Sequence, residues 1–292
     1  MKKINIAILA LMGIISCSKN NEKADGYGNF EATEITISAE SNGKIDFLKV
    51  EEGDLLESQT QVGLVDTLQL YLTKQQLIAS KSTISSKSAN VLSQKSVLAE
   101  QLKTIQLEKN RIRSMYAENA ATKRQVDEID GKVKVIEAQI KSVGTQNAPI
   151  LGDLKAVDAQ IDKINDQIEK SKIVNPITGT ILTKYAEPGE ITAFGKPLYK
   201  IANISEMTLR VFVSEIQLPQ LKIGQEVTVK IDDVEQMKSY KGKISAIATQ
   251  AEFTPKIIQT KEERVNLVYA VKVKVKNDGS LKIGMPAEMW IK

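Results

Sequence analysis

Apolar residues recur every seven positions along the central part of the chain. In the first stretch the repeating position is filled by Leu70, Leu77, Ile84, Val91, Leu98, Ile105 and Ile112. The companion position of a two-stripe coiled coil is polar in the same stretch, being Lys74, Lys81, Ser88 and Lys95. This spacing, without proline, predicts one helix with a single strong apolar stripe that continues to about residue 118. At 1.5 Å per residue, such a helix is roughly 70–75 Å long.

A short break and a second long helix are predicted after the first. Asn119 can end a helix in the left-handed conformation, and Thr122 followed by Gln125 fits a capping box. Two apolar stripes then run to residue 168. One contains Val126, Val133, Ile140, Leu154, Ile161 and Ile168, and the other contains Ile129, Ile136, Val143, Ile150, Val157 and Ile164. Two long helices joined by a few residues are expected to lie antiparallel, as a hairpin.

One place in the second helix departs from this pattern. Asn147 is the polar residue in its stripes, and Gly144, Pro149 and Gly152 lie close to it. Glycine and proline normally interrupt a helix. Because the heptad register continues unchanged after them, we expect a kink at this place and no new domain.

The segments that flank the predicted hairpin repeat each other without a gap. Residues 41–65 align with residues 177–201 at a constant offset of 136. Four glycines match in pairs, Gly43 with Gly179 and Gly53 with Gly189. Alternating apolar residues around these glycines predict short strands joined by tight turns. The two segments are therefore expected to be halves of one small β domain, with the helical hairpin inserted between them.

The C-terminal part is predicted to consist of strands. Residues 207–213 and 269–276 alternate apolar and polar side chains, and the turn sequence Asn277-Asp278-Gly279 follows the second run. Residues 221–231 are echoed at residues 281–291. The polar positions of the second run are Lys272, Lys274 and Lys276, which we interpret as the solvent-facing side of a half-buried sheet.

The N-terminus has the pattern of an export signal. Lys2 and Lys3 precede an apolar run over residues 6–15, and Cys17 follows in the sequence Ile-Ile-Ser-Cys. This ending resembles the lipobox of bacterial lipoproteins, which implies that Cys17 becomes the acylated N-terminus. An ordinary signal peptide or an uncleaved anchor is the alternative. Residues 18–29 are polar and aperiodic, and we expect them to form a flexible tether.

Composition excludes several classes of function. The chain of 292 residues has no histidine and one cysteine, which removes most catalytic triads, most zinc sites and internal disulfides. A net charge of +4 and 4% aromatic residues argue against a nucleic-acid partner. The chain also lacks a phosphate-binding glycine loop. We therefore expect no catalytic residue, no cofactor and no metal site, and a protein that is not an enzyme.

The order of parts resembles the periplasmic adaptor subunits, or membrane fusion proteins, of the hemolysin-secretion type. The resemblance implies a mainly β chain with a long antiparallel coiled-coil hairpin. The expected parts are a signal segment (1–17), a tether (18–29), the first half of a lipoyl-like domain (30–67), the hairpin (68–171), the second half (172–203) and a β-barrel (204–292). True lipoyl domains present a modifiable lysine between their halves. Here Lys74 lies within a helix, which argues against a swinging-arm carrier.

The resemblance also implies a partner site at the tip of the hairpin. In the family, an arginine, an apolar residue four positions later and a hydroxyl residue seven positions after that form the surface offered to an outer-membrane duct of the TolC type. Arg111, Met115 and Thr122 keep this spacing, although the family usually has leucine and serine at the last two positions. The alternatives are capping for Thr122, the end of the coil stripe for Met115 and a solvated helix position for Arg111.

The expected function is that of an adaptor in a tripartite exporter. The resemblance implies a ring of identical subunits in the periplasm, lipid-anchored to the inner membrane and linking an inner-membrane transporter to a TolC-like outer-membrane channel. An ABC-type transporter is favoured over a proton-driven pump, because the chain is short and a full membrane-proximal domain is not evident. The alternatives are an adaptor of a proton-driven pump and a periplasmic lipoprotein that scaffolds an envelope complex without export. The exported substrate and the final membrane stay open.

Overall fold

The computed structural model describes residues 23–232, 237–253 and 267–291. The predicted signal segment, including Cys17, lies outside the described residues. No helix in these described ranges combines the length and the apolarity needed to cross a bilayer.

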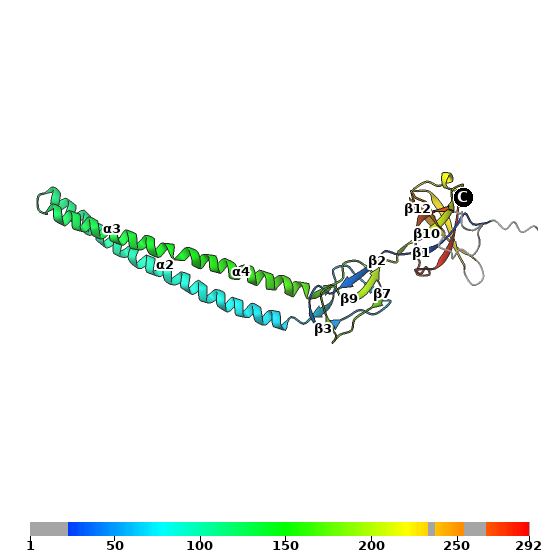
Figure 1. Ribbon diagram of the computed structural model, residues 1–292, viewed down its shortest axis with the longest axis horizontal. Coiled ribbons are helices and arrows are strands. Elements are labelled where there is room, and N and C mark those ends of the chain that lie inside the picture. The colour runs from blue at the N-terminus through cyan, green and yellow to red at the C-terminus, as the bar shows by residue number, and fades with distance from the viewer. Residues whose placement is uncertain (1–22, 233–236, 254–266, 292) are drawn as a thin grey trace, which may run out of the picture. The chain divides into compact units, whose positions relative to one another are not determined.

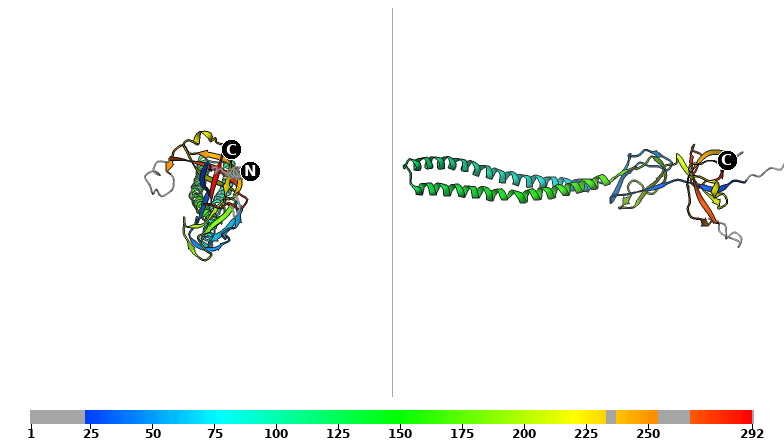
Figure 2. Two further views of the ribbon diagram at one scale, coloured as in Figure 1. Left: turned by 90° about the vertical axis from the view of Figure 1, so that its right-hand side faces the viewer. Right: turned by 90° about the horizontal axis from the view of Figure 1, so that it is seen from above.

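The central part of the chain is a helical hairpin, as predicted. It consists of α2 (Leu68–Ala117), α3 (Lys123–Thr145) and α4 (Asn147–Lys170). The helix α2 packs along both α3 and α4, and Figures 1 and 2 show the two arms side by side over their length. Ile129 and Val133 are the apolar side chains of the hairpin that are buried. Because only two arms cover each other, α2 on one side and α3 with α4 on the other, the coil is narrow and most of its surface is solvated.

The second arm is interrupted between α3 and α4, next to the residues where a kink is expected. Gln146 separates the two segments and keeps a right-handed helical conformation, with φ −69° and ψ −21°. Across from it, the Ser88 hydroxyl donates a hydrogen bond of 2.7 Å to Asn147 Oδ1. The polar residue in the stripe of the second helix thus meets a polar residue from the weak stripe of the first. Each of these two polar side chains interrupts an apolar stripe, and each provides the hydrogen-bond partner of the other.

The lipoyl-like part consists of eight strands in two four-stranded sheets. The strands are β2 (Glu34–Ser38), β3 (Gly43–Leu48), β4 (Leu55–Leu56), β5 (Gln61–Val65), β6 (Lys172–Val174), β7 (Gly179–Lys184), β8 (Ile191–Thr192) and β9 (Pro197–Ala202). Their orders are β2-β9-β7-β4 and β6-β5-β3-β8. Replacing each strand by its counterpart in the sequence repeat converts one order into the other. The two repeated segments are therefore equivalent halves, and each sheet contains two strands from each half.

The repeated glycines have backbone reasons for being glycine. Gly53 and Gly189 have φ values of 94° and 93°, in the left-handed region that other residues avoid. At Gly179, a Cβ atom would lie 2.6 Å from the Ala202 carbonyl oxygen. At Gly43 it would lie 2.9 Å from the side chain of Val65, and φ is 153°. All four positions thus stand at tight turns or close strand contacts.

The C-terminal part is a closed β-barrel. Its elements are β1 (Gly26–Glu31), β10 (Glu206–Ser214), the short helix η1 (Leu218–Gln220), β11 (Glu226–Ile231), β12 (Lys238–Ile247), β13 (Glu252–Phe253), β14 (Leu267–Lys276) and β15 (Pro286–Trp290). The sheet has the order β10-β1-β15-β11-β12-β14-β13, and a further pairing of β10 with β14 closes it. The alternation predicted for residues 207–213 and 269–276 is present. Leu209, Val211, Val271 and Val273 are fully buried in the barrel core.

The strand β1 differs from the expected boundaries, which divided it between the tether and the lipoyl-like domain. It pairs with β10 and β15, so residues 26–31 are a strand of the barrel. Phe30 is fully buried in the barrel core. Gly28 lies so close to β10 that a Cβ atom would overlap the Arg210 carbonyl oxygen. The local sequence of residues 26–29 does not indicate a strand, because this strand is defined by its pairing with β10 and β15, far along the chain.

Candidate functional site at the hairpin tip

The turn between α2 and α3 is closed by backbone hydrogen bonds. Asn119 has φ 60°, the left-handed conformation predicted for it. The Asn119 N–H donates to the Tyr116 carbonyl at 3.1 Å, and the Ala120 N–H donates to the Met115 carbonyl at 2.7 Å. These two bonds form a Schellman motif, which satisfies carbonyls at the end of α2. The tip of the hairpin is consequently a defined turn.

The start of α3 is fixed by the predicted capping box. The Thr122 N–H donates to Gln125 Oε1 at 2.7 Å, and the Gln125 N–H donates to the Thr122 hydroxyl at 3.4 Å. The Thr122 hydroxyl also donates to Gln125 Oε1 at 3.0 Å. This geometry accounts for a hydroxyl residue at position 122 without any partner protein.

Arg111 and Met115 face outward from the last turns of α2. The Arg111 side chain is 74% exposed and has an ion pair with Glu108 at 3.2 Å, within the same helix. Met115 is 40% exposed, and Leu107, one turn before Arg111, is 67% exposed. Residues spaced by four lie on one side of a helix. Leu107, Arg111 and Met115 therefore form one outward stripe, which we call the tip stripe.

A hollow lies beside the tip stripe, between α2 and α3. Its lining includes Ile105, Glu108 and Arg111 from α2 and Ile129 and Lys132 from α3. The isoleucines are apolar, whereas Arg111 and Lys132 are cationic. Such a hollow can accept an apolar side chain with a carboxylate or carbonyl oxygen next to it.

A cross-helix ion pair near the tip was missed from the sequence. Asp130 of α3 lies 2.9 Å from Lys109 Nζ and 2.8 Å from Arg113 Nη2 of α2. The hydrogen bond from Lys109, and then the one from Arg113, lower the pKa of the Asp130 carboxyl below its ordinary value. Lys109 and Arg113 are four residues apart and therefore lie on the same side of α2, which is the feature of the sequence that indicates a shared acidic partner. The facing acid depends on the register between two helices, which the sequence alone does not define.

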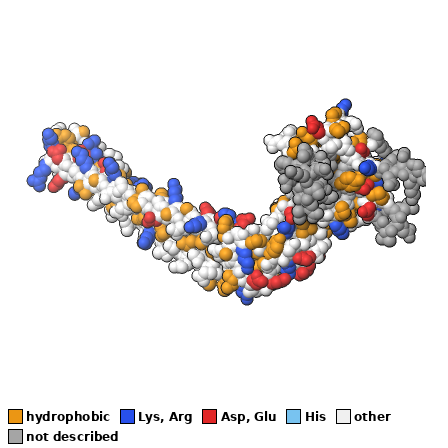
Figure 3. All heavy atoms as spheres, turned by 45° about the vertical axis from the view of Figure 1, so that its right-hand side comes forward, with side chains coloured by type: hydrophobic (Ala, Val, Ile, Leu, Met, Phe, Trp, Pro, Cys, Tyr) orange, Lys and Arg blue, Asp and Glu red, His pale blue; other side chains and the backbone are white. Residues whose placement is uncertain are grey.

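Several basic side chains lie at the tip. Residues 109–124 contain the bases Lys109, Arg111, Arg113, Lys123 and Arg124 and the acid Glu118, and the acids Glu108, Asp127, Glu128 and Asp130 flank them. Figure 3 shows Lys and Arg side chains gathered at the end of the hairpin. Asp130 pairs with Lys109 and Arg113 across the two helices, whereas Arg111 pairs with Glu108 of its own helix. Arg111, Lys123 and Arg124 are therefore the tip bases without a cross-helix ion pair among the described residues. Within the described residues, no group of three or more His, Cys, Asp and Glu side chains is placed to hold a metal ion.

Comparison with known sequences gives matches to the barrel and to the chain as a whole. Residues 207–291 match the model of the YknX-like β-barrel domain. A UPF0194 membrane protein of Enterobacter sp. strain 638 is 25% identical over 98% of this chain and 96% of its own length.

Comparison with solved structures gives matches to the whole arrangement. MacA from Actinobacillus actinomycetemcomitans is 19% identical and has a TM-score of 0.53, covering 90% of this chain and 76% of its own. A MacA-MexA chimeric protein with the Pseudomonas aeruginosa MexA α-hairpin domain has 19% identity and a TM-score of 0.51, covering 90% of this chain and 78% of its own. At such identities the likeness establishes the fold. The chain therefore has the fold of MacA, and its residues 207–291 match the YknX-like β-barrel domain.

Proposed function

We propose that the protein is a non-enzymatic adaptor subunit of a tripartite export system. Its β domains bind an inner-membrane transporter, and its hairpin reaches a TolC-like duct in the outer membrane. The observation that supports this most is the hairpin inserted between the two halves of the lipoyl-like domain. The arm α2 has 50 residues and is therefore about 75 Å long, which suits a protein that bridges partners in two membranes.

The tip stripe is the proposed contact with the duct. Arg111 provides five donors for carbonyl or carboxylate oxygens on the partner, and Met115 provides a flexible apolar contact one turn further on. Both side chains are exposed, and neither has a cross-helix partner among the described residues. The main role of Thr122 is to cap the start of α3, and a contact with the duct is its secondary role.

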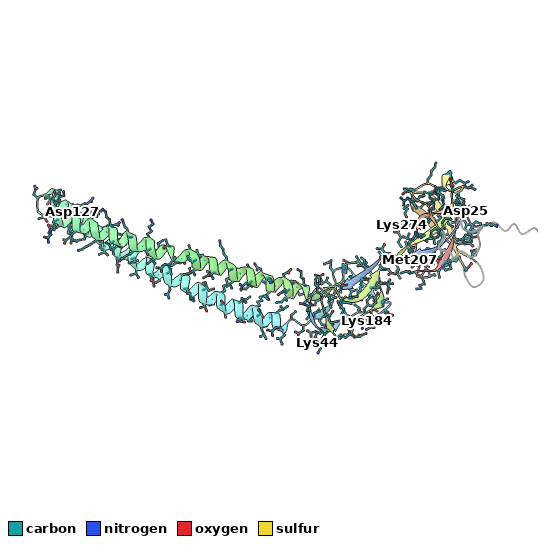
Figure 4. The ribbon with its side chains drawn as sticks, viewed as in Figure 1. Asp25, Lys44, Asp127, Lys184, Met207 and Lys274 are labelled. Atoms are coloured by element: carbon teal, nitrogen blue, oxygen red, sulfur yellow. The ribbon has the colours of Figure 1, made fainter. Side chains whose placement is uncertain are left out.

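Cys17 is the proposed lipid anchor, holding the protein on the periplasmic side of the inner membrane. Fully extended, residues 17–25 span at most about 30 Å. Asp25 is fixed to the barrel, because its Oδ2 accepts a hydrogen bond of 2.6 Å from the Ile291 N–H (Figure 4 labels Asp25). A barrel on so short a connection stays near the membrane surface, where a transporter is embedded.

Two further features belong to the proposal. A two-helix coil encloses no path for a substrate, so several copies are expected to assemble into a ring. An ABC-type transporter is the favoured partner by analogy with the adaptor family that the chain resembles, and a proton-driven pump is the alternative.

Co-purification of the intact chain from cell membranes tests this function. The expected result is recovery of both an inner-membrane transporter and an outer-membrane channel, identified by mass spectrometry, with the channel lost when the hairpin is deleted. Recovery of envelope proteins without any transporter would instead favour a scaffold that takes no part in export.

A further inference from the structure

The outer wall of the barrel contains a hollow lined by lysines from two neighbouring strands. Its volume is about 550 Å³, and its lining includes Lys241 and Lys243 of β12 and Lys274 and Lys276 of β14. Figure 4 labels Lys274 on the barrel. The volume lies in the range typical of small-molecule sites. From the sequence, the β14 lysines are interpreted as the solvent-facing side of a sheet. That interpretation does not explain why four lysines from two strands line one hollow.

The charges in this lysine hollow are not balanced. Lys243 and Lys274 lie directly opposite each other in the antiparallel register of β12 and β14. Like charges at opposed positions destabilise a sheet. Lys274 has an ion pair of 2.7 Å with Glu206. Glu226 of β11 lies opposite Lys243, and Glu206 of β10 lies opposite Lys276, and both glutamates line the hollow. Lys241, Lys243 and Lys276 nevertheless have no ion pair with any carboxylate that the structure describes, so four lysines face two acids.

One side of the lysine hollow is apolar. Ile223 lines it and is 69% exposed. The loop that contains Ile223 is held against β12, because the Gly224 N–H donates to the Ile244 carbonyl at 2.8 Å. The Ile244 N–H in turn donates to the Gln225 carbonyl at 2.9 Å. Ile223 is thus fixed beside the lysines by the backbone.

We propose that the lysine hollow binds a phosphate-bearing amphiphile. The phosphate group is held by Lys243 and Lys276 and relieves the repulsion between Lys243 and Lys274. The apolar part of the ligand lies on Ile223. Ammonium groups bind phosphate as strong point charges, and a desolvated apolar neighbour adds affinity for a ligand with a hydrocarbon part. The ligand is either a phospholipid headgroup within a bilayer or a free phosphorylated molecule. This site is independent of the proposed docking at the hairpin tip.

Calorimetric titration of the full-length chain with short-chain dihexanoyl phosphatidylglycerol, below its micelle concentration, tests the site. The chain has the Cys17→Ala substitution, so that no acyl group competes. The Lys243→Ala/Lys276→Ala variant is expected to lose at least tenfold in affinity. The matched control Lys134→Ala/Lys141→Ala, which removes the same charge from α3, is expected to stay within twofold. The melting temperature of neither variant should fall below that of the parent, and Lys243→Gln/Lys276→Gln replaces the alanine pair if it does not fold.

Two further titrations complete the test. Ile223→Ser is expected to weaken the phospholipid several-fold while leaving inorganic phosphate unchanged. Sedimentation with phosphatidylcholine vesicles, with and without phosphatidylglycerol, separates the two sources. Lysine-dependent binding to the anionic vesicles supports a bilayer headgroup, and lysine-dependent binding to the short-chain lipid alone supports a free phosphorylated molecule. The proposal is overturned if the parent binds no phosphate-bearing probe, or if the α3 control loses as much affinity as the barrel variant.

Discussion

Single side chains at the hairpin tip divide into those that hold the turn and those that face outward. Thr122, Gln125 and Asn119 close the turn with their own hydrogen bonds or backbone conformation. Arg111 and Met115 take no part in the turn through their side chains. A partner can therefore use these two residues at little cost to the fold.

Reversing the charge of Arg111 separates docking from folding. Arg111→Asp removes an exposed side chain, so the free energy of unfolding should change by no more than about 0.5 kcal/mol. A reversed charge in a desolvated contact costs several kcal/mol, so the co-purified outer-membrane channel should fall more than tenfold. Lys155→Asp, an exposed charge reversal on α4, is the control. Unchanged recovery of the channel with Arg111→Asp would mean that Arg111 is a solvated helix residue.

The Asp130 ion pair makes a prediction about pH. Asp130→Asn removes the acceptor shared by Lys109 and Arg113 and should lower the melting temperature of the hairpin at neutral pH. The pKa of Asp130 is lowered in the folded state, so the stabilisation is present above the ordinary carboxyl value and fades as pH falls through about 4 and below.

Melting curves of the parent and the variant between pH 7 and pH 2 check this prediction. The gap between the two melting temperatures should narrow on acidification. Asp127→Asn, which removes a neighbouring exposed acid, should show almost no gap at any pH. A gap that stays constant across this range would contradict the assignment to the Asp130 carboxylate.

Among the elements, the interruption between α3 and α4 lies at one polar pair. Ser88→Ala leaves the Asn147 amide without its partner, which should cost about 1–3 kcal/mol. Adding Asn147→Leu restores an apolar stripe and should recover most of that loss. Chemical denaturation of the two single variants and the double variant measures the coupling, with Ser96→Ala as an exposed control. Strictly additive effects would show that the hydrogen bond contributes nothing in solution.

Elements could be predicted where the determining residues are neighbours in the chain. The end of α2 at Asn119, the cap at Thr122 and the break near Asn147 each follow from residues within a few positions. The Asp130 ion pair and the Ser88–Asn147 bond depend on how α2 and the second arm align, which local patterns leave undetermined. The pairing of β1 with β10 and β15 depends in the same way on contacts made far along the chain.

For the whole molecule, the hairpin is expected to be removable from the lipoyl-like domain. Leu64 of β5 pairs with Lys172 of β6, so the two ends of the hairpin leave from neighbouring strands. Joining Asp66 to Lys172 through a short glycine-containing turn should leave the β domains folded, with cooperative unfolding and lost helical circular dichroism. A longer deletion through Pro176, which also removes β6, should destabilise them. An unfolded chain after the shorter deletion would contradict the inserted-hairpin architecture.

The bridging of two membranes is tested most directly by photo-crosslinking in living cells. A photoreactive amino acid is placed at Met115 in the tip stripe and, as the control, at Lys155 on α4. The account predicts that position 115 crosslinks to an outer-membrane channel and that position 155 does not. Crosslinking of position 115 only to other periplasmic proteins, in cells where the channel is present, would contradict the docking of this hairpin to a duct.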